Sequence, residues 1–207
     1  MNWLPRLSLV FLCVLLHACG PDKDMPIDDA GTLAYVTLDA ELTQFRVDFN
    51  DMSDKVRLVF ISGPSCGICL RGLDDLNRAI VASIQDDPRV HTMVLHVPTL
   101  GAEEKHAAAS VPLMYGPRVS HYWDPTGHSG QEFQEALGID FYAWDVWMIY
   151  PPGAGWQDAQ PPPAPDYWEH QLGPLPEETK LDAGRFAGRV REAINKDLRR
   201  RTRSASP

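Results

Sequence analysis

The chain has 207 residues, of which 28 are acidic and 19 are basic, so its formal net charge is −9. This acidic balance argues against nucleic acid as a partner, because the phosphate backbone binds basic surfaces. Apolar residues make up 44% of the chain, which is enough for a globular core, and four cysteines are too few for a framework of several disulfides.

The N-terminus has the layout of an export signal. Arg6 precedes an apolar run over residues 7–16, which is too short to span a bilayer, and Cys19 directly follows a small residue. This arrangement resembles the lipobox of bacterial lipoproteins. It predicts a signal peptide over residues 1–18, an acylated Cys19, and a polar tether over residues 19–31. The expected location is the bacterial cell envelope, lipid-anchored at a membrane and facing the periplasm or the exterior.

The first half of the domain reads as alternating helices and strands. Spacings of three and four between apolar residues predict a first helix, and two apolar runs on either side of a second amphipathic helix predict parallel strands buried on both faces. The expected elements are a helix over 39–50, a strand over 58–61, a helix continuing to about residue 85, and a strand over 92–97.

The second half is less regular. We expect a short Ala-rich helix and a loop in the stretch 99–128, then a helix that begins with a capping box and ends at Gly138. After these come a strand over 146–150, a tight turn over 151–153 and a returning edge strand that begins at Trp156. The remaining expectations are an ordered proline-rich loop over 160–176, a last helix over 186–198, and a solvated basic tail over 199–207.

Two cysteines, Cys66 and Cys69, lie where the apolar strand gives way to the second helix. A helix start offers unpaired N–H groups and the positive end of the macrodipole, which stabilise a thiolate. Cys66 is therefore the expected nucleophile. Cys69 begins the apolar stripe of the helix, so we expect it to be the sheltered resolving thiol.

This order of elements, with CxxC at a helix start, is similar to the thioredoxin fold. The residues from Gly63-Pro64-Ser65-Cys66 to Trp144-Asp145-Val146-Trp147 look like an exported, lipoprotein branch of that superfamily. The resemblance implies an α/β domain over residues 32–198, with a central mixed sheet flanked by helices and an insertion around residues 99–128. It also implies a substrate groove formed by Pro64, Ser65, Gly67, Ile68 and Trp144.

The activity that the resemblance implies is thiol–disulfide exchange with exported proteins. It requires no cofactor beyond the cysteines and a second redox protein that recharges them. Three positions depart from the thioredoxin pattern. Asp145 stands where the cis-proline is expected, Phe60 where a buried acid is expected, and Ser65 where an aromatic residue precedes the first cysteine. Asp145 is thus a candidate proton acceptor for Cys69 or a charge that tunes Cys66, unless it only caps the strand.

Other readings of the cysteine pair stay open at this point. A copper chaperone of the Sco type would use the two thiols with His96, His121, His128 or His170 as a third ligand. No second CxxC or close Cys/His pair completes a zinc site, so zinc is disfavoured and we assign no residue as a metal ligand. A structural disulfide is less favoured because it would close almost no loop. A non-catalytic binding module is the third alternative.

Overall fold

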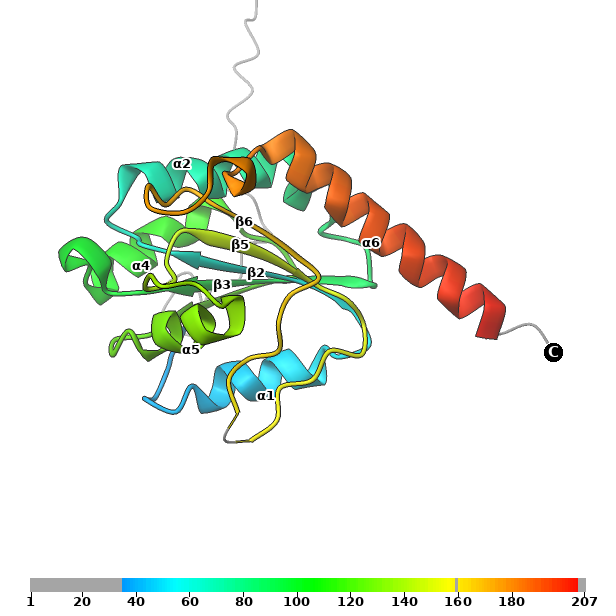
Figure 1. Cartoon of the computed structure of the whole chain (residues 1–207), viewed down its shortest axis with the longest axis horizontal. Helices are drawn as coiled ribbons and strands as arrows, with labels where there is room; N and C mark the ends of the chain where they lie inside the picture. The colour runs from blue at the N-terminus through cyan, green and yellow to red at the C-terminus, as the bar shows by residue number, and fades with distance from the viewer. Residues whose placement is uncertain (1–34, 159, 205–207) are drawn as a thin grey trace, which may run out of the picture.

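A six-stranded mixed sheet, in the order β1-β4-β3-β2-β5-β6, forms the centre of the computed structural model, which describes residues 35–158 and 160–204 (Figure 1). The first four strands of this order run parallel, β5 is antiparallel to β2, and β6 is antiparallel to β5. The strands are β1 Val36–Thr37, β2 Val56–Ser62, β3 Val90–His96, β4 Val119–Trp123, β5 Val146–Tyr150 and β6 Tyr167–His170.

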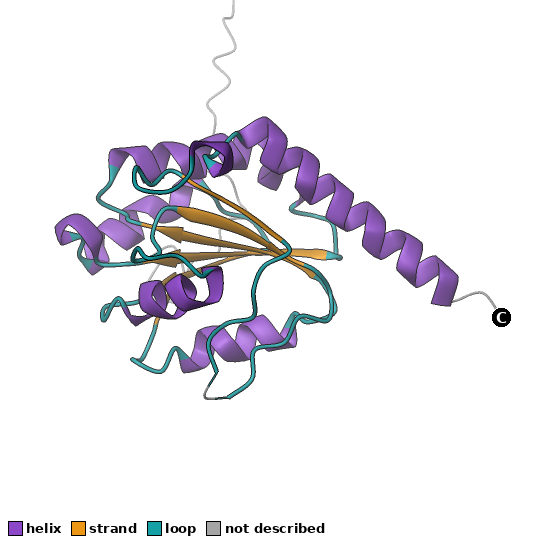
Figure 2. Ribbon diagram, viewed as in Figure 1, coloured by secondary structure: helices purple, strands orange, loops and turns teal. Residues whose placement is uncertain are grey.

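Helices cover both faces of the sheet (Figure 2). Helices α2 and α6 lie on one face, and α1 and α5 lie on the other. The helices are α1 Thr43–Asp51, α2 Gly67–Leu76, α3 Ala82–Ile84, α4 Glu104–Ser110, α5 His128–Leu137 and α6 Ala183–Ser204. A π-helical segment, Asn77–Val81, joins α2 to α3, and short 3₁₀ turns lie at Thr99–Gly101, Val111–Leu113 and Glu177–Thr179.

The two middle strands are buried along their whole length. In β2, Val59 and Ile61 pack into the cluster beneath α1 and α5, while Leu58 and Phe60 pack into the cluster beneath α2 and α6. Side chains alternate between the faces of a strand, so a strand covered on both sides needs an unbroken apolar run. The sequence predicts this βαβ unit, and the structure confirms it.

The stretch 99–128 adds a strand to the sheet, where the sequence predicts only a loop after the short helix. The strand β4 pairs with β3, and β1 pairs with the outer side of β4. The prediction was wrong because β4 carries polar residues at its centre. His121 of β4 is buried, and its ring nitrogen lies 3.0 Å from a ring nitrogen of His96 on β3. This partner is far away in the sequence.

The edge strand also differs from the prediction. Trp156 does not begin a strand. It is buried against Phe45, Phe49 and Phe133 on the α1/α5 face, with ring centroids 5.8 to 6.2 Å apart. The edge strand is β6, which lies within the proline-rich stretch expected to be an ordered loop. The prolines lie before and after the strand but not within it, so its N–H groups are free to pair with β5.

The last helix extends further than the apolar spacing predicts. It continues through the basic residues to Ser204, and Arg199, Arg200, Arg201 and Arg203 are exposed. The predicted signal peptide, Cys19 and the tether over 19–31 lie outside the described residues. Across 35–158 and 160–204, no helix has both the length and the apolar composition needed to cross a membrane.

Candidate functional site

The cysteine pair lies after the carboxyl end of β2, at the start of helix α2. Gly63 and Pro64 turn the chain, and the Cys66 N–H donates to the Gly63 carbonyl at 2.9 Å. Cys66 is the N-cap of α2, and its Sγ accepts from the Cys69 N–H at 3.5 Å. Both thiols are free, Cys66 half-exposed and Cys69 buried. The structure thus places one accessible thiol at the helix start and one sheltered thiol on its first turn, as the spacing predicts.

Asp145 occupies the loop directly before β5. Its φ is +56°, in the left-handed region, and no cis peptide bond occurs in the described parts of the chain. An Asp adopts this region more readily than most residues. Its carbonyl accepts from the Gln171 N–H at 3.1 Å, which ties the loop to the end of β6. The residue that replaces the expected cis-proline therefore has a different backbone conformation.

The Asp145 side chain is 3% exposed and lies against Cys69. Burial raises the pKa of this carboxyl to about 7, and a hydrogen bond from the Cys69 thiol opposes part of the rise. The pKa of Cys69 is raised as well, first by burial and then by the Asp145 charge and the contact with Cys66. Asp145 Oδ1 has no hydrogen-bond partner among the described residues. A proton that leaves Cys69 thus has a carboxylate beside it to accept it.

Gly63 is enclosed by two other loops. A Cβ atom on Gly63 would lie 2.5 Å from Thr99 Oγ1 and 3.0 Å from Cε3 of the Trp144 ring. The turn before Cys66 therefore fits between the loop after β3 and the loop before β5, and only a glycine allows this close approach.

The loop after β3 is also attached to the residue before Cys66. The Ser65 hydroxyl donates to the carbonyls of Thr99 and Leu100, at 3.2 and 3.3 Å. Leu100 has φ +54° and a side chain that is 69% exposed. Sequence reasoning missed Thr99 and Leu100, because nothing in the local pattern places them next to Ser65.

The predicted groove residues do not share one environment. Ser65, Gly67 and Ile68 are exposed, Trp144 is half-buried, and Pro64 is buried. All five belong to the CxxC loop, the start of α2 or the loop before β5. Phe60, at the position of the expected acid, packs edge-on against Trp147 with ring centroids 5.5 Å apart. The space that an acid would occupy is therefore apolar.

The four histidines considered as copper ligands are engaged elsewhere. His96 and His121 are stacked and buried, and burial lowers the pKa of His121 to about 4. His128 Nε2 lies 3.1 Å from Glu132 Oε1, and His170 accepts from the Leu172 N–H. Within the described residues, no group of three or more His, Cys, Asp or Glu side chains is arranged to hold a metal ion.

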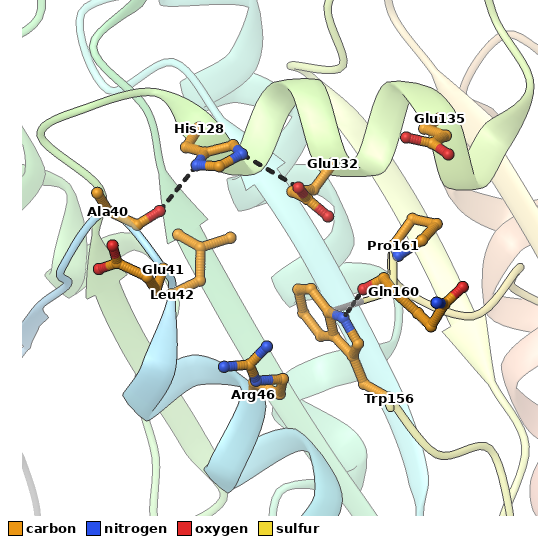
Figure 3. Close-up of a pocket in the computed structure, with 10 residues that line it drawn as sticks. All are labelled: Ala40, Glu41, Leu42, Arg46, His128, Glu132, Glu135, Trp156, Gln160 and Pro161. Atoms are coloured by element: carbon orange, nitrogen blue, oxygen red, sulfur yellow. Dashed lines mark hydrogen bonds and ion pairs between the residues drawn. The ribbon is translucent and has the colours of Figure 1, made fainter. Parts of the chain in front are cut away.

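A cavity of about 610 Å³ lies between α1, α5 and the loop around Trp156 (Figure 3). His128 Nδ1 lies 2.8 Å from the Ala40 carbonyl oxygen, and the Trp156 indole N–H donates to the Gln160 carbonyl. Because α1 and α5 cover the face of the sheet opposite α2, this cavity is separate from the cysteine pair.

No protein-family model and no curated protein matches the chain. Solved structures do match. A secreted Mycobacterium tuberculosis disulfide oxidoreductase, homologous to Escherichia coli DsbE, is 11% identical with a TM-score of 0.46, covering 69% of this chain and 84% of that one. Copper-bound ScoI from Arabidopsis thaliana is 12% identical with a TM-score of 0.42, covering 70% and 88%. An exposed lipoprotein thioredoxin from Streptococcus pneumoniae is 18% identical with a TM-score of 0.37, covering 72% and 87%.

These similarities are low, and the chain's own topology decides the fold. The CxxC pair follows β2, which is flanked by the parallel β3 and the antiparallel β5, and β6 and α6 complete the sequence of elements. The extra strand β4 comes from the insertion between β3 and α5. By this strand order and the position of its cysteine pair, the chain has a thioredoxin-like fold.

Proposed function

We propose that this protein is an extracytoplasmic thiol–disulfide oxidoreductase that exchanges disulfides with exported proteins. The observation that supports the proposal is the asymmetry of the pair. Cys66 is half-exposed at the start of α2, whereas Cys69 is buried with the Asp145 carboxyl against it. A structural disulfide needs no such asymmetry. An exchange reaction needs one accessible thiol that attacks the partner disulfide and one sheltered thiol that resolves the mixed disulfide.

In the reducing direction, the Cys66 thiolate attacks one sulfur of a partner disulfide. A Cys66–partner disulfide forms, the partner's S–S bond breaks, and the leaving sulfur takes up a proton. Cys69 then gives its proton to Asp145 and attacks Cys66 Sγ. The Cys66–Cys69 disulfide forms and the partner's second thiol is released, so two electrons pass from the pair to the partner.

We also propose that the protein is held at the bacterial cell envelope by acylation of Cys19, facing the periplasm or the exterior. The short apolar run over residues 7–16, followed closely by Ala18-Cys19, supports this location. The oxidised pair must then be reduced by another thiol protein outside the cytoplasm, which is an implied partner.

The test is to trap the intermediate with Cys69→Ser. The reduced variant is mixed with a synthetic peptide that carries a disulfide, and the products are analysed by mass spectrometry without reductant. We expect a stable adduct at Cys66 that a reducing agent releases, because no second thiol remains to resolve it. The wild-type protein under the same conditions should release the reduced peptide and accumulate no adduct.

The matched control is Cys66→Ser, which keeps one thiol but only the buried one. It should form no adduct at neutral pH, because burial keeps the Cys69 thiol protonated and inaccessible. Adducts that form on Cys69 as readily as on Cys66 would contradict the assignment of roles. Tight stoichiometric Cu(I) binding by a wild-type protein without exchange activity would instead favour the copper chaperone.

A further inference from the structure

Five large apolar side chains are exposed in the described parts of the chain, and two of them flank the reactive thiol. Ile68, 50% exposed, lies two residues after Cys66 in α2. Leu100, 69% exposed, lies on the loop whose backbone bonds to Ser65, the residue before Cys66. Val36, Val47 and Leu198 are the other three. Exposed apolar side chains that gather at one place mark interaction sites more often than ones scattered singly.

Leu100 is also held in a conformation that its side chain does not favour. Its φ of +54° and ψ of +34° lie in the left-handed region, where the Cβ atom of a leucine is strained and a glycine is not. Its side chain packs into none of the hydrophobic clusters of the described chain. A leucine at this position is therefore favoured neither by the backbone conformation nor by packing in the core.

The loop that carries Leu100 is fixed rather than free. Ser65 donates to two of its carbonyls, and the Ala102 N–H donates to the Thr99 carbonyl at 3.0 Å. Thr99 also packs on Gly63. These contacts hold Leu100 at one side of the CxxC loop, on the insertion between β3 and α5. On the other side, Asp145 is buried and exposes no apolar surface of its own.

We propose that Leu100 is a specificity-determining residue, which selects partner polypeptides that have an apolar side chain next to the exchanging cysteine. The inference rests on the proposed function. Recognition then comes from the insertion loop, with Ile68 completing the apolar contact. The partner is an extended segment of an exported polypeptide, because the reacting sulfur must reach Cys66 while the neighbouring side chain packs on Leu100. Ser65 is the positioning residue, since its hydroxyl holds the loop.

The test compares two synthetic disulfide-linked peptides of equal length, with Leu or with Ser beside the cysteine. The measured quantity is the second-order rate constant for exchange with the reduced full-length protein. We expect the wild type to prefer the Leu peptide about five- to tenfold, as partial burial of two apolar side chains allows. Leu100→Asn should abolish this preference by lowering the rate for the Leu peptide to that for the Ser peptide. Asparagine adopts the left-handed region easily, so the variant keeps the loop.

Leu198→Asn is the matched control, because it removes an exposed leucine from α6, on which no residue of the site lies. It should keep the full preference. Equal loss of rate for both peptides in Leu100→Asn, or a preference that survives it, would overturn the inference while leaving the proposed function intact. A wild-type protein that exchanges with neither peptide would overturn the proposed function, and the inference with it.

Discussion

Asp145 is a buried carboxyl group whose protonation depends on the folded state. Its unfolded pKa is near 3.8 and burial raises the folded value to about 7. An acid with a raised pKa binds its proton more tightly when folded. The protonated Asp145 therefore contributes to the free energy of unfolding in full below about pH 4. This contribution, of the order of 4 kcal/mol, is lost as the pH rises from about 4 through about 7.

We predict that Asp145→Asn removes this loss of stability and slows resolution of the mixed disulfide. Asparagine keeps the shape and tolerates the positive φ, but it takes no proton from Cys69. The free energy of unfolding of the reduced variant should exceed that of the wild type at pH 8, and the two values should converge toward pH 4. Denaturant titrations at several pH values measure the first effect, and the rate of peptide release from the adduct measures the second.

Asp158→Asn is the control, because the Asp158 side chain is 98% exposed. Its stability should follow the wild-type pH profile. Parallel profiles for Asp145→Asn and the wild type would reduce Asp145 to a structural residue of the loop.

At the scale of single elements, helix α2 approaches the sheet closely at Gly72, one turn after Cys69. A Cβ atom on Gly72 would lie 2.6 Å from Cζ2 of Trp147 in β5 and would also clash with the Gln171 side chain. The buried Trp147 ring cannot move without disturbing the core around Phe60. This contact sets the distance between the cysteine helix and β5.

We predict that Gly72→Ala destabilises the protein by about 1–3 kcal/mol, because the overpacking outweighs the gain in helix propensity. Gly188→Ala in α6 is the matched control, since nothing lies within 4 Å of the added methyl group. It should be neutral or stabilising by up to about 1 kcal/mol. The free energy of unfolding decides between the outcomes, and a stabilised Gly72→Ala would show that α2 is not held by this contact.

The elements that the sequence predicts well are those with a local signal. The apolar run of β2, the spacing from Cys69 along α2 and the stop of α5 at Gly138 each appear in a few consecutive residues. The capping box predicted at Ser129 was wrong, because α5 has Gly127 as its N-cap and the Ser129 hydroxyl donates to Asp124. Counting back from Gly153 also places Asp145 at the position of the cis-proline in the thioredoxin pattern. The failures at β4, β6 and Trp156 have one physical cause, which is that a distant contact decides the structure. His121 is acceptable in a buried strand because its ring nitrogens bond to His96 and to the Met114 carbonyl. Leu100 becomes part of the site only through Ser65.

At the scale of the whole molecule, the cysteine pair and the end of the last helix lie at opposite ends of the sheet (Figure 1). Helix α6 begins near the carboxyl end of β6 and runs back past the start of β2, where Arg201 donates to the Asp54 carbonyl. The exposed arginines of its last turns are therefore remote from Cys66. Their positive charges lie at the C-terminus of the helix, where they complement the helix dipole.

We predict that the mature protein partitions into the detergent-rich phase, because an acyl chain on Cys19 adds apolar surface that the domain lacks. Cys19→Ala should shift it to the aqueous phase or stall its processing. Cys13→Ala is the matched control, since it removes a cysteine of the apolar run without touching the acylation position. Phase separation followed by immunoblotting measures the distribution. A wild-type protein found wholly in the aqueous phase would remove the anchor and leave the fold untouched.

The left-handed backbone at Leu100 also governs how this position can change during evolution. Backbone energetics alone would let it drift to glycine or asparagine, which relieve the conformation at no cost to the core. β-Branched residues and proline are excluded by the same dihedral angles. If partner recognition is what retains a leucine there, the position evolves under two opposed pressures. Lineages that lose the apolar partner should then be the ones in which the loop relaxes to glycine or asparagine.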